Sequence, residues 1–145
     1  MSNAQILYAV KPTDTHLLYF DVHIPAGFPS PALDHMEHKL SLDELLDINA
    51  PHTYVLKVSG ESMTGAGIFD GDYIIVSRAR ESKPRDIVAA YLNGEIFVKR
   101  LGKSHGGYVL QSEHPDYPPR YVQEDDELRI WGVVTHSLRD HRAHA

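Results

Sequence analysis

Four glycines fall between positions 60 and 71, and they restrict what this part of the chain can form. Glycine weakens helices, and it lets a backbone adopt positive φ or approach a second segment closely. Strand-like apolar runs lie on both sides, at residues 54–58 and 73–76. The pattern predicts a strand, a glycine-rich turn and a second strand.

The turn carries Ser62, whose hydroxyl is a candidate nucleophile, although an ordinary turn can have the same composition. The sequence does not match the G-x-S-x-G nucleophile elbow of α/β-hydrolases. Residues Gly60 to Gly65 have the pattern G-x-S-x-x-G, and no helical run follows. A dinucleotide-binding loop is excluded too, because these glycines lead into a strand rather than a helix. A serine needs a base to become nucleophilic, and a lysine that loses its proton on desolvation can serve.

Lys99 is the candidate base. Residues 87–101 predict a β-hairpin with its tight turn at Asn93-Gly94. Side chains alternate along a strand, so Lys99 shares one face with Phe97 and Leu101, and burial there would lower its pKa. The alternative from the pattern alone is an edge-strand lysine that discourages aggregation.

Six short motifs run through most of the chain. They are Gly27-Phe28-Pro29-Ser30-Pro31-Ala32, Ser59-Gly60-Glu61-Ser62-Met63, Asp70-Gly71-Asp72, Gly94-Glu95, Val98-Lys99-Arg100-Leu101 and Trp131-Gly132-Val133-Val134-Thr135-His136. Together they resemble the LexA/UmuD family of self-cleaving Ser-Lys peptidases over about residues 26–139. By this resemblance Ser62 is the nucleophile and Lys99 the general base. The backbone N–H of Ser62 is the expected oxyanion donor.

The N-terminal part carries a candidate cleavage site. Residues 18–24 alternate apolar and polar side chains, which predicts a strand that ends at Pro25. Proteases bind substrates in extended form, although an ordinary N-terminal strand would show the same pattern. The resemblance implies cleavage between a small residue and glycine, here Ala26-Gly27, which lies 36 residues before Ser62. Lys99 follows Ser62 by 37 residues, a spacing similar to that of the UmuD branch.

The remaining patterns predict a mostly β protein. A capping box, Ser41-x-x-Glu44, opens one short helix through Ile48. Strands are expected at residues 53–58, 72–77, 86–92, 95–102, 108–112 and 128–137. Short strands at close spacing predict a twisted, partly closed antiparallel β-barrel, similar to the LexA and signal-peptidase domains. We expect residues 1–33 to form an extended arm and residues 34–145 a peptidase and dimerisation domain.

Charge and composition narrow the class of protein. The net charge of -6 gives no support to direct nucleic-acid binding. The absence of cysteine excludes disulfides and thiolate zinc sites. The sequence has neither an apolar run of about 20 residues nor a signal-peptide pattern, so a cytoplasmic protein without a membrane span is expected.

The ten histidines raise the possibility of a metal site. Candidate ligands are His35, His38, His136, His141 and His144. No H-E-x-x-H motif occurs, and the three C-terminal histidines are most simply part of a solvated chain end. We therefore expect neither a metal nor another cofactor.

The resemblance also implies a role in the SOS response to DNA damage. A RecA filament on single-stranded DNA would stimulate the cut after Ala26. The shortened homodimer would then join a UmuC-like Y-family polymerase subunit in translesion synthesis.

Three other functions are open to such a chain. A LexA-type or phage-type repressor fragment is disfavoured, because the arm is too short for a helix-turn-helix of about 20 residues. A non-enzymatic dimerisation module would not need Ser62, Lys99 and the Ala26-Gly27 pair. A leader peptidase would need a membrane anchor, which this sequence lacks.

Overall fold

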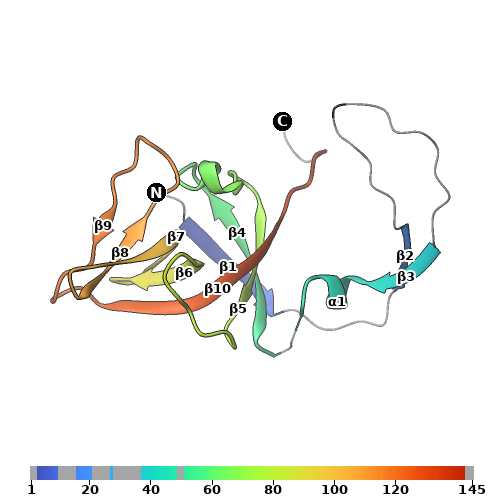
Figure 1. Cartoon of the computed structure of the whole chain (residues 1–145), viewed down its shortest axis with the longest axis horizontal. Coiled ribbons are helices and arrows are strands. Elements are labelled where there is room, and N and C mark those ends of the chain that lie inside the picture. Colours follow the sequence, from blue (N-terminus) through green and yellow to red (C-terminus); the bar gives the residue numbers. More distant parts are fainter. Residues whose placement is uncertain (1–2, 10–15, 21–26, 28–36, 49–50, 143–145) are drawn as a thin grey trace. The chain divides into compact units, whose positions relative to one another are not determined.

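The computed structural model describes residues 3–9, 16–20, 27, 37–48 and 51–142 (Figure 1). The chain forms two compact units, one of residues 1–11 and 49–145 and the other of residues 12–48. In the described residues, no helix has the length and apolarity needed to cross a bilayer.

The larger unit is an antiparallel β-barrel. Its strands are β1 (Asn3–Ala9), β4 (Thr53–Ser59), β5 (Tyr73–Ser77), β6 (Ile87–Leu92), β7 (Glu95–Ser104), β8 (Gly107–Gln111), β9 (Arg120–Tyr121) and β10 (Leu128–Leu138). The strand order is β1-β4-β5-β10-β6-β7-β8-β9, and the pair Asn3–Phe97 joins β1 to β7. This contact closes six strands into a barrel, while β8 and β9 extend the sheet beyond β7. The predicted mostly-β, barrel-like class is confirmed.

β1 is a strand that the sequence patterns did not predict. It pairs with β4 from Asn3–Ser59 to Ala9–Tyr54, within the stretch expected to be an extended arm. A register shift between Ile6 and Tyr8 breaks the alternation of side chains that would have identified it. Residues 3–9 therefore form part of the barrel sheet.

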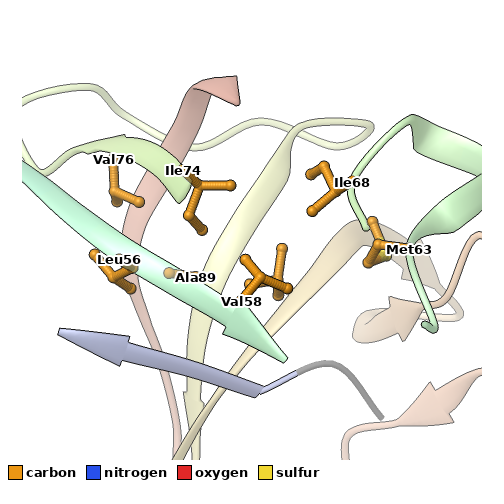
Figure 2. Close-up of a cluster of buried hydrophobic side chains, with 8 residues drawn as sticks. Leu56, Val58, Met63, Ile68, Ile74, Val76 and Ala89 are labelled. Carbon is orange, nitrogen blue, oxygen red and sulfur yellow. The ribbon is translucent and has the colours of Figure 1, made fainter. Parts of the chain in front are cut away.

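The barrel contains two clusters of buried apolar side chains. The first is Leu56, Val58, Met63, Ile68, Ile74, Val76, Ala89 and Val98, most of which are labelled in Figure 2. The second is Val88, Ala90, Leu92, Phe97, Leu101 and Leu110. β7 supplies both clusters because successive side chains of a strand point to opposite faces. Met63 and Ile68 come from the segment after β4, so that segment is anchored in the core at two points.

The smaller unit contains one strand pair and one short helix. β2 (His16–Phe20) pairs antiparallel with β3 (Glu37–Ser41), and α1 (Leu42–Leu45) follows directly. The predicted helix start is correct: Ser41 is the N-cap, and its Oγ accepts a hydrogen bond from the N–H of Asp43 at 3.2 Å. The helix ends before the predicted Ile48, and Asp47 adopts a φ of 50°.

Two expectations about this unit lie partly outside the described residues. β2 covers the first part of the strand predicted at residues 18–24, and residues 21–26 are not described. The expected boundary at residue 33 falls within residues 28–36, which are also not described. The division into arm and peptidase domain stays a prediction.

An ion pair joins the end of β10 to the segment that follows β4. Asp72 is 2% exposed, and Arg139 donates to it from Nε at 2.9 Å and from Nη2 at 3.0 Å. The N–H of Phe69 donates to the same carboxylate at 2.8 Å. Burial alone would raise the pKa of Asp72, but the hydrogen bonds from Arg139 and Phe69 outweigh it and hold that pKa below the usual value.

The contribution of the Arg139–Asp72 ion pair to stability can be tested by removing Arg139. We expect Arg139→Ala to lower the free energy of unfolding by about 2–4 kcal/mol at pH 7, because it leaves a buried carboxylate uncompensated. A depressed carboxyl pKa contributes stability at neutral pH that is lost in acid, so the difference from wild type should shrink near about pH 3. Urea unfolding at both pH values measures this, with the exposed Arg142→Ala as control. Equal losses in the two variants would contradict it.

Candidate active site

Ser62 lies in a compact turn between β4 and a 3₁₀ turn, η1 (Thr64–Ala66). Gly60 leaves β4 with a φ of 93°, and its N–H donates to Asp70 Oδ1 at 2.8 Å. Within the turn, the N–H of Ala66 donates to the Met63 carbonyl at 3.0 Å. Positive φ at Gly60 is the backbone freedom that the sequence pattern predicted at this point.

A second segment holds this turn from the other side. The N–H of Glu113 donates to the Ser62 carbonyl, and the N–H of Gly65 donates to the Glu113 carbonyl, both at 2.8 Å. A Cβ at Gly65 would lie 2.6 Å from that carbonyl oxygen, so only glycine fits without a shift. The chain just after β8 is thereby bound to the turn that carries Ser62.

Lys99 extends from β7 to the Ser62 hydroxyl. Its Nζ lies 2.9 Å from Ser62 Oγ and 2.7 Å from Ser112 Oγ. The whole Lys99 residue is 1% exposed and Ser62 is 0% exposed. Desolvation by this burial lowers the pKa of Lys99 to about 8. The amine is therefore much closer to losing its proton at neutral pH than a lysine in water, which a general base requires.

Two side chains that lie near the Lys99 amine were not predicted from the sequence. The first is Ser112, which lies opposite Lys99 because the β7–β8 register pairs Arg100 with Gln111, a pairing that no local pattern in the sequence shows. The second is Tyr117, whose ring centroid lies 5.9 Å from Lys99 Nζ. No sequence motif pointed to Tyr117.

The predicted cleavage site is only partly visible. Gly27 is exposed and belongs to the smaller unit, and Ala26 lies outside the described residues. The cleavage site and the role of the Ser62 N–H as oxyanion donor therefore stay predictions.

The histidines do not form a metal site in the part of the chain that the structure describes. There, no group of three His, Cys, Asp or Glu residues could hold a metal ion. His35 and His144 lie outside this part, and the side chain of His38 is not described.

The comparison with known proteins is consistent with this geometry. A family model described as Peptidase S24-like matches residues 18–135. The chain belongs to this family. The resemblance to the LexA/UmuD peptidases inferred from the motifs is thereby confirmed, and membership supports a serine peptidase in general terms.

Relatives of two kinds are similar to the chain. Protein MucA of Salmonella typhimurium is 41% identical over 119 residues, which cover 81% of each chain. The LexA repressor of Bordetella pertussis is 38% identical over 121 residues, 83% of this chain but 56% of the repressor. The LexA repressor of Verrucomicrobium spinosum is 40% identical over 118 residues, 80% of this chain and 57% of the repressor. The similarity thus extends over most of MucA and over little more than half of the repressors.

Proposed function

We propose that the chain is a self-cleaving serine peptidase that cuts its own N-terminal segment between Ala26 and Gly27. The observation that carries this proposal is the hydrogen bond of 2.9 Å between Lys99 Nζ and Ser62 Oγ in a buried site. A lysine with its pKa lowered to about 8 is suited to take the proton of that hydroxyl.

The proposed reaction has two stages. Ser62 Oγ attacks the Ala26 carbonyl carbon while neutral Lys99 takes the hydroxyl proton, and the Ser62 N–H stabilises the oxyanion. The C–N bond then breaks, and the Lys99 ammonium returns the proton to the departing Gly27 amine. In the second stage Lys99 takes a proton from water while the water oxygen attacks the Ala26 carbonyl carbon of the ester. The bond from that carbon to Ser62 Oγ then breaks, and the Lys99 ammonium returns the proton to Ser62 Oγ.

The biological setting is proposed from the relatives. Because the match with MucA covers most of both chains, we favour the role of an accessory subunit of an error-prone translesion polymerase. In that role a RecA filament stimulates the cut in the SOS response, and the shortened homodimer joins a UmuC-like subunit. Sedimentation at the mass of a single chain would contradict the dimer. A repressor fragment is the second candidate, because LexA repressors also match more than 80% of this chain.

Intact-protein mass spectrometry tests the cleavage. After incubation in chelator at alkaline pH, and separately with activated RecA filament at neutral pH, we expect a new C-terminal product that begins at Gly27. Ser62→Ala should remain uncut under both conditions, which excludes a contaminating protease. A product with another N-terminus, or an intact wild-type chain in both incubations, would overturn the proposal.

A further inference from the structure

We propose that Ser112 is the positioning residue of the dyad, and that its hydroxyl holds the Lys99 amine against Ser62 Oγ. This inference rests on the proposed function and assigns a role to a residue outside the Ser62–Lys99 pair. The amine lies between two hydroxyls, with Ser112 Oγ at 2.7 Å and Ser62 Oγ at 2.9 Å. A lysine side chain has four rotatable bonds, so a second fixed partner restricts where its nitrogen can lie.

The β7–β8 hairpin determines where Ser112 lies. The pairs Leu101–Leu110 and Arg100–Gln111 precede it, so Ser112 follows directly opposite Lys99. The adjacent residue, Glu113, exchanges backbone hydrogen bonds with Ser62 and Gly65. Two consecutive residues thus contact both halves of the site: Ser112 binds the base, and Glu113 binds the turn of the nucleophile.

An ion pair supports the position of this dipeptide. Arg100 Nε donates to Glu113 Oε1, and Arg100 Nη1 donates to the Arg85 carbonyl at 2.6 Å. Arg100 follows Lys99 on β7, so the two side chains point to opposite faces of the strand. One hairpin therefore holds Ser112 through Lys99 on one side and Glu113 through Arg100 on the other.

The ionisable side chains described around Lys99 do not take the place of Ser112 as the partner that orients the amine. The Glu113 carboxylate is engaged by Arg100, and Glu61 of the neighbouring turn is exposed. The centroid of the Tyr117 ring lies 5.9 Å from Nζ, at the outer limit of a cation–π contact. Desolvation is the cause of the lowered Lys99 pKa, with no neighbouring charge contributing. The Ser112 hydroxyl is therefore a neutral partner that orients the amine.

The test compares first-order cleavage rates of wild type, Ser112→Ala and Ser112→Thr across the pH range in which Lys99 loses its proton. We expect Ser112→Ala to lower the alkaline plateau about 10- to 100-fold, because a misplacement of about 1 Å can cost about 100-fold. Ser112→Thr keeps the hydroxyl and should recover most of the rate. Ser104→Ala, in the same hairpin, is the control and should cut like wild type.

The midpoint of the pH profile separates positioning from general damage. Loss of a hydrogen-bond acceptor destabilises the charged ammonium, so in Ser112→Ala the Lys99 pKa should fall further. A variant that merely loosened the site would admit water and move the midpoint to higher pH. A plateau equal to wild type, or a midpoint at higher pH, would overturn the role of Ser112.

A measurement independent of cleavage keeps the two proposals distinct. The Lys99 pKa can be followed by NMR of the lysine Cε in Ser62→Ala, with and without Ser112→Ala, and Lys99→Met assigns the signal. We expect the Ser112→Ala change to lower this pKa, and an unchanged or raised pKa would refute the contact. A wild-type chain that never cuts contradicts the proposed peptidase, while the NMR result still decides the role of Ser112.

Discussion

Substitution of Lys99 by methionine is expected to abolish self-cleavage, with a rate at least about 10⁴-fold below wild type. Methionine keeps a long unbranched side chain in the buried position but cannot accept the proton of Ser62. Ser62→Ala should have an equally large effect, because the proposed nucleophile and base would act as one unit. The rates are measured by densitometry or mass spectrometry of the cut and intact chains.

Matched controls lie on the same strand. Lys103→Met removes an exposed lysine of β7 four residues from Lys99, and it should cut at the wild-type rate. Thermal unfolding should show that Lys99→Met remains folded, since it replaces a buried amine by an apolar group. Cleavage by Lys99→Met at the wild-type rate would remove lysine from the mechanism.

The second large effect concerns pH. With the Lys99 pKa at about 8, roughly one-tenth of the amines are neutral at pH 7. The spontaneous rate should therefore rise about tenfold between pH 7 and about pH 9, and then reach a plateau. A lysine with the ordinary pKa of about 10.4 would instead give a rate that still climbs near pH 10. First-order rates in chelator from about pH 6 to 11 distinguish the two profiles.

The direction of this pH dependence follows from the proposed role of the Lys99 amine as a base. A base must be unprotonated, so activity is lost as pH falls through its pKa and gained as pH rises through it. Histidine as the base would give a midpoint near about 6.5. A flat profile, or loss of activity in chelator, would reopen the histidine and metal interpretations.

The two main residues of the site could be predicted because their signals are local. The glycines around Ser62 indicate a tight turn, and the alternation of Phe97, Lys99 and Leu101 indicates a buried lysine. Both depend on residues within a few positions of one another. Ser112 could not be placed in this way, because its position depends on the register of two paired strands.

The fold likewise has features with a local sequence signal and features that depend on residues distant in sequence. Strands β4 to β8 and β10 lie close to their predicted positions, since short apolar runs and turn residues mark them. The partly closed barrel was predicted, but the strand pair that closes it, Asn3–Phe97, could not be, because its residues are far apart in sequence. The pairing of Arg139 with Asp72 was missed for the same reason.

The position of β10 in the sheet determines at which stage of protein synthesis the site can assemble. β10 lies between β5 and β6, so it joins the strands beside Ser62 to the hairpin that carries Lys99. Ribosomes deliver a chain from its N-terminus, so β10 emerges after the other strands described in this barrel. A nascent chain holds its first segment and its serine long before it holds an assembled dyad. If the chain cleaves itself as proposed, the cut can begin only after β10 has been made and has joined the two parts of the site.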